Sequence, residues 1–163
     1  MKGRLVVFCG IPGAGKTTIA RLVANSFENS ILIETDGVRR MLARPSFSPG
    51  ESRFVYSACF AIAKEALKTG HFVLLEGTFL REEYRLEARK VLRRYYVRVD
   101  TIWVRCDLET ALERNSVRDA VVPAVKVEAM FDAFEVPNVA VRVDTSRMTP
   151  ESASRRVVLA LTR

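Results

Sequence analysis

A dense group of glycines interrupts the beginning of the chain, where residues 8–20 read FCGIPGAGKTTIA. From Gly10 to Thr17 the stretch fits GxxxxGK[ST] at every fixed position. Glycines let the backbone turn so that successive N–H groups point inward at phosphate oxygens, and the following helix adds the positive end of its dipole. An ordinary tight turn is the alternative. The pattern follows an apolar strand-like run and opens a helical segment, which is the context of a phosphate-binding loop.

This loop predicts which groups hold a nucleoside triphosphate. Lys16 would reach the β- and γ-phosphates, and the Thr17 hydroxyl would hold Mg²⁺. The predicted nucleotide contacts within the loop are Gly10, Gly13, Ala14, Gly15, Lys16, Thr17 and Thr18.

Strand-like apolar runs alternate with segments of helical period along the chain. Strands are expected over residues 4–9, 30–34, 71–77, 99–105 and 139–143. Helices are expected over residues 16–27, 36–42, 51–69, 81–95, 108–115 and 125–134, with a last one starting at Thr149-Pro150-Glu151. Such alternation predicts a parallel sheet covered on both faces. The sequence therefore predicts an α/β fold of the P-loop NTPase type, with a five-stranded parallel sheet between helices, as a single domain over residues 1–163.

The composition bears on the partner and the compartment. The net charge of +7, from 20 Arg and 6 Lys against 19 acidic residues, favours polyanions such as nucleotides, RNA or acidic metabolites. Genome composition or adaptation to heat would give the same bias. No apolar run approaches the ~18 residues of a membrane span. Cys9, Cys59 and Cys106 stand far apart in apolar segments, as buried thiols in a reducing compartment do. We therefore expect a cytoplasmic protein without a membrane partner.

Two acidic residues stand where strands are expected to end. Glu76 closes the run FVLLE, where this architecture places a carboxylate facing the metal; a solvent-facing charge is the alternative. Asp36 follows the second strand, with Arg39 on the same face of a short helix. Asp36 would cap that helix, or would lie across the crevice from the γ-phosphate and accept the proton of, or orient, an attacking hydroxyl. The two roles are compatible.

A pair of arginines ends the helix that follows the fourth strand. Arg114 and Arg118 lie four residues apart in LERNSVRD. They form either a solvated basic helix end favoured by the dipole or part of a lid, over about residues 114–137, that closes on the phosphates and excludes water.

The basic run RLEARKVLRRYYVR, residues 85–98, also has two interpretations. Its arginines would pair with Glu82, Glu83 and Glu87 on a solvated helix face. Alternatively, with Tyr95 and Tyr96, they would form a surface for a nucleic-acid backbone.

The order of the motifs, from the glycine loop through TDGVR and VLLEGT to ERNSVR, resembles the P-loop kinases of the polynucleotide 5′-kinase group, with zeta-toxin-like kinases, chloramphenicol phosphotransferase and seryl-tRNA kinase. The resemblance implies a nucleoside-kinase-like fold with an arginine-bearing lid. It also implies that Asp36 is the general base and that Arg39 contacts a phosphate of the acceptor. Arg114 and Arg118 would then clamp the ATP phosphates.

Two other segments are compared with this group. Polynucleotide kinases often carry Asp-x-Thr-Asn after the third strand, where this chain has Glu76-Gly77-Thr78-Phe79. The tail VDTSRMTPE resembles the stretch that borders the adenine ring in small kinases. Asp144, Thr145 and Ser146 are therefore candidate contacts, although turn and cap chemistry explains them equally well.

The sequence thus predicts a Mg²⁺-dependent ATP phosphotransferase. The predicted catalytic residues are Lys16, Asp36, Arg39, Arg114 and Arg118, and the predicted metal ligands are Thr17 and Glu76. The expected acceptor is the 5′-hydroxyl of RNA or DNA. A small-molecule hydroxyl on a sugar, nucleoside or antibiotic is an alternative, as is a tRNA-linked kinase or accessory ATPase. The choice between ATP and GTP and the oligomeric state stay open.

Overall fold

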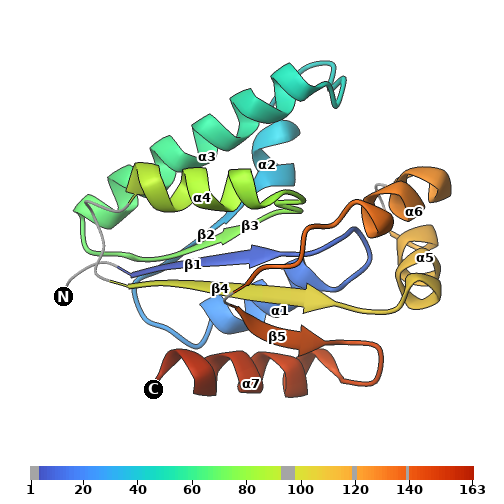
Figure 1. The fold of residues 1–163 in the computed structure, drawn as a ribbon. Helices are drawn as coiled ribbons and strands as arrows, with labels where there is room; N and C mark the ends of the chain where they lie inside the picture. The colour runs from blue at the N-terminus through green and yellow to red at the C-terminus, as the bar shows by residue number, and fades with distance from the viewer. Residues whose placement is uncertain (1–3, 93–97, 119–120, 139) are drawn as a thin grey trace.

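The computed structural model describes residues 4–92, 98–118, 121–138 and 140–163 (Figure 1). A five-stranded parallel sheet with strand order β2-β3-β1-β4-β5 runs through its centre. The strands are β1 (Arg4–Cys9), β2 (Ser30–Glu34), β3 (Phe72–Glu76), β4 (Arg98–Arg105) and β5 (Val141–Asp144). The predicted fold class is confirmed.

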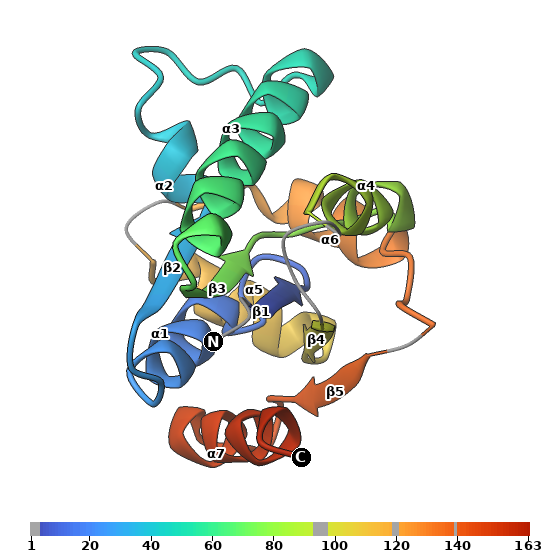
Figure 2. The same cartoon turned by 90° about the vertical axis from the view of Figure 1, so that its left-hand side faces the viewer.

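Helices cover both faces of this sheet. They are α1 (Lys16–Ala24), α2 (Thr35–Arg39), α3 (Pro49–Lys68), α4 (Glu82–Leu92), α5 (Leu108–Ser116), α6 (Ala124–Asp132) and α7 (Pro150–Leu161). Helices α3 and α4 lie on one face and α1 and α7 on the other (Figure 2). Helices α5 and α6 lie beyond the carboxyl ends of the strands (Figure 1). The carboxyl edge of the sheet is therefore the side at which a crevice forms.

The central strand β1 explains why both layers hold together. Its side chains alternate between the two faces because a strand has a period of two residues. Leu5 and Val7 pack with α3 and α4, whereas Val6 and Phe8 pack with α1 and α7, and all four are at most 1% exposed. A strand buried on both faces has no polar alternation, which is how the sequence reads here.

Most helix boundaries differ from the predicted ones by a few residues. The predicted helix 16–27 ends at Ala24. The amides of Ser26 and Phe27 bond to carbonyls only three residues back, which is not the α-helical pattern. The same tightening ends α2 at Arg39 instead of residue 42. Helix α7 begins as predicted, with the Thr149 side chain accepting from the Ser152 amide. Residue 139 of the fifth predicted strand and residues 93–95 of the predicted helix 81–95 lie outside the described residues.

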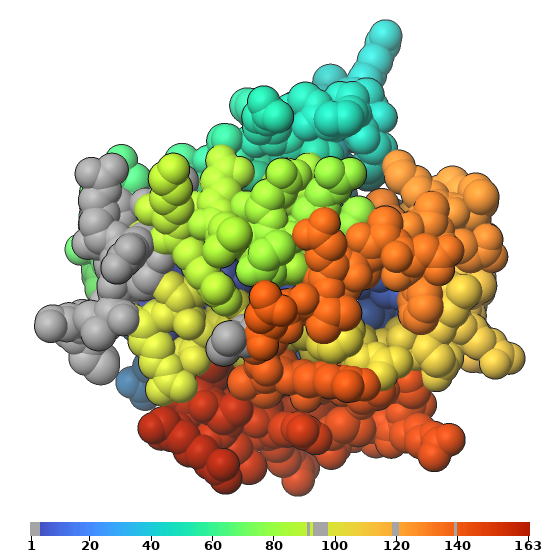
Figure 3. Space-filling model, in the orientation of Figure 1, coloured from blue at the N-terminus to red at the C-terminus, as the bar shows by residue number. Residues whose placement is uncertain are grey.

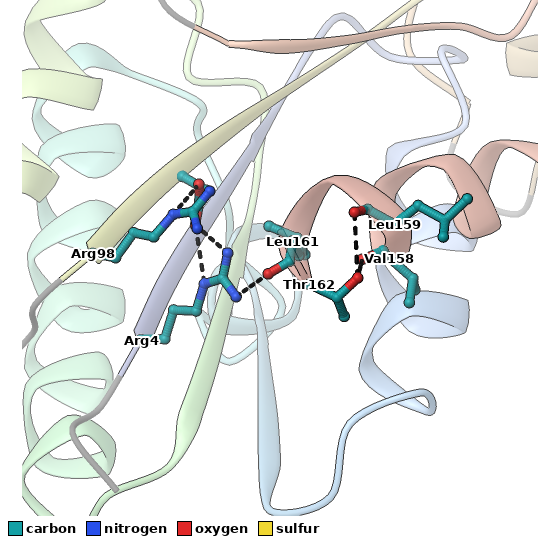
Figure 4. Close-up of polar contacts among 7 residues, drawn as sticks. Arg4, Arg98, Val158, Leu159, Leu161 and Thr162 are labelled. Atoms are coloured by element: carbon teal, nitrogen blue, oxygen red, sulfur yellow. Dashed lines mark hydrogen bonds and ion pairs between the residues drawn. The ribbon is translucent and has the colours of Figure 1, made fainter.

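The amino end of the sheet is tied to the last helix. Arg4 donates to Oδ2 of Asp100 on β4 at 2.8 Å and to the carbonyl oxygen of Leu161 at the end of α7 (Figure 4). Arg98 donates to the other oxygen of the same carboxylate at 3.0 Å. A cation among the last carbonyls of a helix is favourable. These contacts join β1, β4 and α7 at the end of the sheet that lies opposite the glycine loop.

The cysteines are buried and free, as predicted. Burial raises the pKa of the Cys9 and Cys59 thiols to about 12. In the part of the chain that the structure describes, no helix combines the length and the apolar character that crossing a bilayer requires.

Candidate active site

The glycine loop leaves β1 at the carboxyl edge of the sheet and turns directly into α1. Gly10 and Gly13 have φ values of +150° and +81°, which disfavour a side chain. A Cβ at Gly10 would lie 2.1 Å from the carbonyl oxygen of Val104, and one at Gly13 would lie 2.2 Å from that of Ala111. The loop backbone is therefore held directly against β4 and α5, with no room for side chains between them.

A cleft of about 660 Å³ opens beside this loop. Its walls come from the loop and α1, from the end of β2 with α2, from the end of β3, and from the end of α5. The lining residues are Gly13, Gly15, Lys16, Thr17, Thr18, Arg21, Glu34, Thr35, Asp36, Arg40, Glu76, Gly77, Thr78, Arg114, Val117 and Arg118. Nine of these sixteen lining residues are predicted site residues.

Two of the predicted loop contacts do not line the cleft. Gly10 packs against β4, and Ala14 is fully buried, with its carbonyl oxygen accepting from the Thr145 hydroxyl at 2.9 Å. Both therefore shape the loop from behind.

The floor of the cleft holds a buried lysine beside a buried carboxylate. Lys16 Nζ lies 3.8 Å from Glu76 Oε1 and donates to the carbonyl oxygen of Ile11 at 3.0 Å. Glu76 is 4% exposed and hydrogen-bonds with the Thr17 side chain. Burial raises the pKa of Glu76, and the positive charge of Lys16 opposes that rise. The alternative of a solvent-facing charge at the end of β3 is wrong.

Thr17 and Glu76 together have the chemistry of a magnesium site. A hydroxyl and a carboxylate are oxygen donors, and Mg²⁺ is usually bound by one or two carboxylates together with phosphate oxygens and water. Among the described residues, no group of three or more His, Cys, Asp or Glu side chains could hold a metal unaided. A hydroxyl and a carboxylate beside the glycine loop fit a cation whose other ligands are phosphate oxygens and water.

Asp36 lies on the opposite wall, in the first turn of α2. The N-cap of that helix is Glu34, so the alternative in which Asp36 caps α2 is wrong. The Asp36 side chain is 58% exposed, and its Oδ2 lies 3.7 Å from Arg118, two residues past the end of α5. An ion pair thus links α2 to the segment predicted to form the lid.

Arg114 belongs to the last turn of α5 and is fixed by the tail of the chain. Its guanidinium donates to the hydroxyl and to the carbonyl oxygen of Thr145, each at 2.9 Å. The Ser146 hydroxyl accepts from the Asp107 amide, and Asp144 accepts from the Ser146 amide. Asp144 and Ser146 thus make local turn and cap contacts, Thr145 joins Arg114 to the glycine loop, and none of the three lines the cleft.

Arg39 and Arg40 occupy different places. Arg39 does not line the cleft: its guanidinium pairs with Glu51 of α3 and lies 4.8 Å from the centre of the Phe47 ring. Arg40 lines the cleft instead. The sequence around Arg39 and Arg40 does not indicate which of them lines the cleft. The direction of the Arg39 side chain depends on Glu51, which comes twelve residues later.

Other lining residues were not predicted. Arg21 of α1 pairs with Glu34 through two bonds of 2.8 and 3.0 Å, which join α1 to the end of β2 at the cleft wall. Thr78 comes two residues after Glu76, and its position just past the end of β3 was the available signal.

The basic run was expected to form a solvated helix face on α4, but one of its arginines is buried. Arg85 is 1% exposed and is paired with Glu82, so the interpretation of a wholly solvated helix face is wrong for it. Arg93, Arg94, Tyr95 and Tyr96, which carried the nucleic-acid interpretation, lie outside the described residues.

Sequence comparison places this chain among known proteins. Residues 5–149 match the family AAA_33, an AAA domain. The chain is 21% identical over 155 residues to the L-seryl-tRNA(Sec) kinase of Methanococcus maripaludis, covering 93% of this chain and 60% of that protein. The human protein of the same name is 28% identical over 85 residues, or 52% of this chain and 24% of that one. The chain therefore spans less than two thirds of the length of these relatives.

Solved structures share the fold at low sequence identity. The APS kinase CysC of Mycobacterium tuberculosis, solved with AMPPNP and APS, superposes with a TM-score of 0.81 at 22% identity, over 99% of each chain. A sugar kinase of Janibacter sp. HTCC2649 gives 0.76 at 22% identity, over 98% of this chain and 95% of that one. The Pnkp1/Rnl/Hen1 RNA repair complex gives 0.70 at 19% identity, over 81% of this chain and 44% of that one. The chain belongs to the AAA_33 family, and its fold is that of the P-loop kinases.

Proposed function

We propose that this chain is an ATP-dependent kinase that transfers the γ-phosphoryl group to a hydroxyl, and that its acceptor is the 5′-hydroxyl of RNA or DNA. One observation carries the proposal. Asp36 on one wall of a single cleft faces the glycine loop and Lys16 on the other, with Arg114 and Arg118 at its edge. A carboxylate on that wall is in a position to accept the proton of a hydroxyl that attacks the terminal phosphate.

The loop side of the cleft binds the donor. Backbone N–H groups from Gly13 to Thr18, the amino end of α1 and the Lys16 ammonium would hold the triphosphate. Thr17 and Glu76 would hold Mg²⁺, which when bound neutralises charge on the β- and γ-phosphates. The buried carboxylate of Glu76 gains by such a cation because burial disfavours its charged form.

The α2 side of the cleft activates the acceptor. The Asp36 carboxylate would accept the proton of the acceptor hydroxyl as that oxygen forms its bond to the γ-phosphorus. The bond between this phosphorus and the bridging oxygen breaks, and ADP leaves with the electron pair. Asp36 is well placed because it stays partly exposed at the mouth of the cleft.

The end of α5 would supply charge to the transferred group. Arg114 is held by Thr145, and Arg118 reaches Asp36. Phosphoryl transfer depends on positioning and on electrostatic stabilisation of the equatorial oxygens. Two guanidinium groups beside Lys16 would provide that stabilisation, and closing them over the phosphates would exclude water.

A polynucleotide acceptor is supported by charge. The net charge is +7, and three arginines are exposed near the cleft: Arg40 just past α2, Arg44 in the α2–α3 segment and Arg53 on α3. Exposed cations near the acceptor side attract a phosphate backbone. The names of the sequence relatives also link them to an RNA substrate, a seryl-tRNA.

A small-molecule hydroxyl is the second candidate. The cleft of about 660 Å³ is within the ~300–1,000 Å³ range of small-ligand sites. The fold also matches a sugar kinase along nearly its full length.

Transfer of label from ATP separates these candidates. The protein is incubated with γ-³²P-ATP and, in parallel, with 5′-hydroxyl oligonucleotides, bulk tRNA, and a panel of sugars and nucleosides. We expect label on the 5′ end of the oligonucleotides, and none with the Lys16→Ala variant. Label on a sugar alone would favour the second candidate. Release of inorganic phosphate without any labelled product would overturn the kinase proposal.

A further inference from the structure

Thr145 follows β5 directly and is buried outside the lining of the cleft. Its backbone amide donates to the Arg105 carbonyl oxygen of β4 at 2.8 Å. In Figure 3 the gold surface of α5 meets the orange-red surface that leads into α7 at the lower right. From the segment between β5 and α7, the hydrogen bonds of Thr145 reach both α5 and the glycine loop. Thr145 is therefore a point at which three parts of the nucleotide side of the protein meet.

The Arg114 side chain binds Thr145 through two nitrogens at once. Nη1 donates to the hydroxyl oxygen and Nη2 to the carbonyl oxygen, each at 2.9 Å. Two parallel bonds fix the direction of a planar guanidinium group, as one bond cannot. A Cβ added at Gly15 would lie 3.9 Å from the same Nη1, so the guanidinium is held beside the glycine loop. The direction of Arg114 is thus set by groups of the protein itself.

The hydroxyl of Thr145 also orients a peptide group of the glycine loop. It donates to the Ala14 carbonyl oxygen at 2.9 Å; the Arg105 carbonyl oxygen, at 3.2 Å, already accepts from the Thr145 amide. In a planar trans peptide the C=O of one residue and the N–H of the next point in opposite directions, and the described residues contain no cis peptide bond. Holding the Ala14 oxygen against Thr145 therefore turns the Gly15 amide toward the cleft that Gly15 lines.

We propose that Thr145 is a positioning residue for the triphosphate: its hydroxyl sets the direction of both the Arg114 guanidinium and the Gly15 amide. This inference rests on the proposed function, because it takes the cleft to hold a nucleoside triphosphate. Phosphoryl transfer depends on charges and dipoles that are already aimed at the phosphate oxygens. The role differs from the adenine contact considered for Thr145 from the sequence. Its hydroxyl hydrogen and its carbonyl oxygen are engaged by the loop and by Arg114.

Thr145→Val tests the proposal, because valine keeps the shape of the side chain and loses the hydroxyl. Calorimetry measures the binding of Mg²⁺-ATP and of Mg²⁺-tripolyphosphate, which has no base, to the full chain. We expect the Kd of both ligands to rise by the same factor, about tenfold, the order that a hydrogen bond to a charged group supplies. A rise for ATP alone would overturn the proposal, since a contact with the base would then explain it.

Two further variants separate positioning from folding. Thr145→Ser keeps the hydroxyl and should have the wild-type Kd for both ligands. Thr101→Val is the matched control, because Thr101 is also 4% exposed, its hydroxyl accepts from Arg89 at 2.8 Å, and it does not line the cleft. This variant should bind both ligands as wild type does. If it bound them as weakly as Thr145→Val, general destabilisation would be the cause and the proposal would be wrong.

Arg114→Lys tests the same contact from its other partner and does not depend on how well Thr145→Val folds. Lysine keeps the positive charge but lacks the fork that grips Thr145. We expect the Kd of ATP to rise about tenfold. Adding Thr145→Val to Arg114→Lys should then raise it by less than Thr145→Val does alone, because the two residues act through a shared contact. Wild-type affinity in Arg114→Lys, or factors that multiply in full, would contradict the proposal.

Binding and transfer report on the two proposals separately. If wild-type protein binds ATP but labels no acceptor, the proposed function is wrong, and the Kd values still decide the role of Thr145. If wild-type protein labels an acceptor and Thr145→Val binds ATP and tripolyphosphate as tightly as wild type does, the positioning role is wrong and the kinase stands.

Discussion

Among the residues of the cleft, Asp36 has the most specific proposed role, that of the general base. Asp36→Asn keeps the shape of the side chain but removes its ability to accept a proton. We expect kcat to fall by about 10²–10⁴-fold, the usual contribution of a general base. ATP affinity should change little because the phosphates are held from the other wall. Labelled-product assays and ATP titration measure the two quantities separately.

A matched substitution controls for the loss of one negative charge. Asp132, an exposed residue at the end of α6, does not line the cleft. Asp132→Asn should retain wild-type turnover. Normal turnover in Asp36→Asn would show that Asp36 is not the general base.

Arg118 has a proposed role toward both the donor phosphates and the acceptor. It lines the cleft with the phosphate loop and also lies 3.7 Å from Asp36. Arg118→Ala should lower turnover and weaken ATP binding, each by about tenfold or more, because bonds between charged groups contribute about 1.5–3 kcal/mol. Arg155→Ala, which removes an exposed arginine of α7, should change neither. An unchanged ATP affinity in Arg118→Ala would count against its role as a clamp.

The segment between α2 and α3 depends on the charge of one carboxylate. The backbone N–H of Ser46 is the main group that lowers the pKa of Glu51, to about 2, with further bonds from the Ser46 hydroxyl and Arg39. A carboxyl whose pKa is lower in the folded state adds stability above its unfolded pKa and loses it as pH falls through the folded one. Glu51→Gln should therefore lower the melting temperature at pH 7, and the difference from wild type should shrink below about pH 4.3 and vanish near pH 2.

Thermal unfolding followed by circular dichroism at several pH values between 7 and 2 tests this expectation. Glu128→Gln, at an exposed position on α6, is the control. A difference between wild type and Glu51→Gln that stays constant from pH 7 to pH 2 would show that Glu51 acts through shape alone.

The secondary structure and the cleft were readable from local patterns, whereas the orientation of several arginines was not. The strands over residues 4–9 and 30–34 have the predicted bounds, because an apolar run bounded by turn residues is a local signal. The glycine loop is also local, and it fixed one wall of the cleft. Arg39 turned away from the cleft because of Glu51, on another helix. Such ion pairs depend on how helices pack against one another, so a short stretch of sequence cannot predict them.

The parallel topology itself explains where the cleft forms. The chain passes from β1 to β2 on one side of the sheet and later to β4 on the other, so the connections diverge beside β1. Ligands bind in open α/β sheets at such a divergence, beyond the carboxyl ends of the strands. The loops after β1 and β3 meet there, where the Gly10 amide donates to the Thr78 carbonyl oxygen at 3.1 Å. The glycine loop and the loop after β3 are thereby joined through the backbone.

Arg85 joins three parts of the protein that are far apart in the chain. Its side chain donates to the Phe79 carbonyl oxygen at 2.5 Å, to the Glu135 carbonyl oxygen at 2.6 Å and to the Glu82 carboxylate at 2.7 Å. The first belongs to the loop after β3, the second to the segment that follows α6, and the third to α4 itself. The Phe134 ring lies 5.6 Å from the guanidinium carbon. One buried arginine thus connects the loop that carries Thr78 to the segment that follows α6.

Arg85→Met tests this connection, because methionine fills much of the volume but donates no hydrogen bond. Two carbonyl oxygens and a carboxylate lose their partner, and breaking a buried pair costs about 3–5 kcal/mol. Urea unfolding should show a loss of that size, with a smaller loss in Arg85→Lys, which keeps the charge and part of the bonding. Arg81→Met, which removes an exposed arginine just before α4, should stay within about 0.5 kcal/mol of wild type. If Arg85→Met were as stable as Arg81→Met, packing of α4 alone would hold the lid segment to the loop after β3.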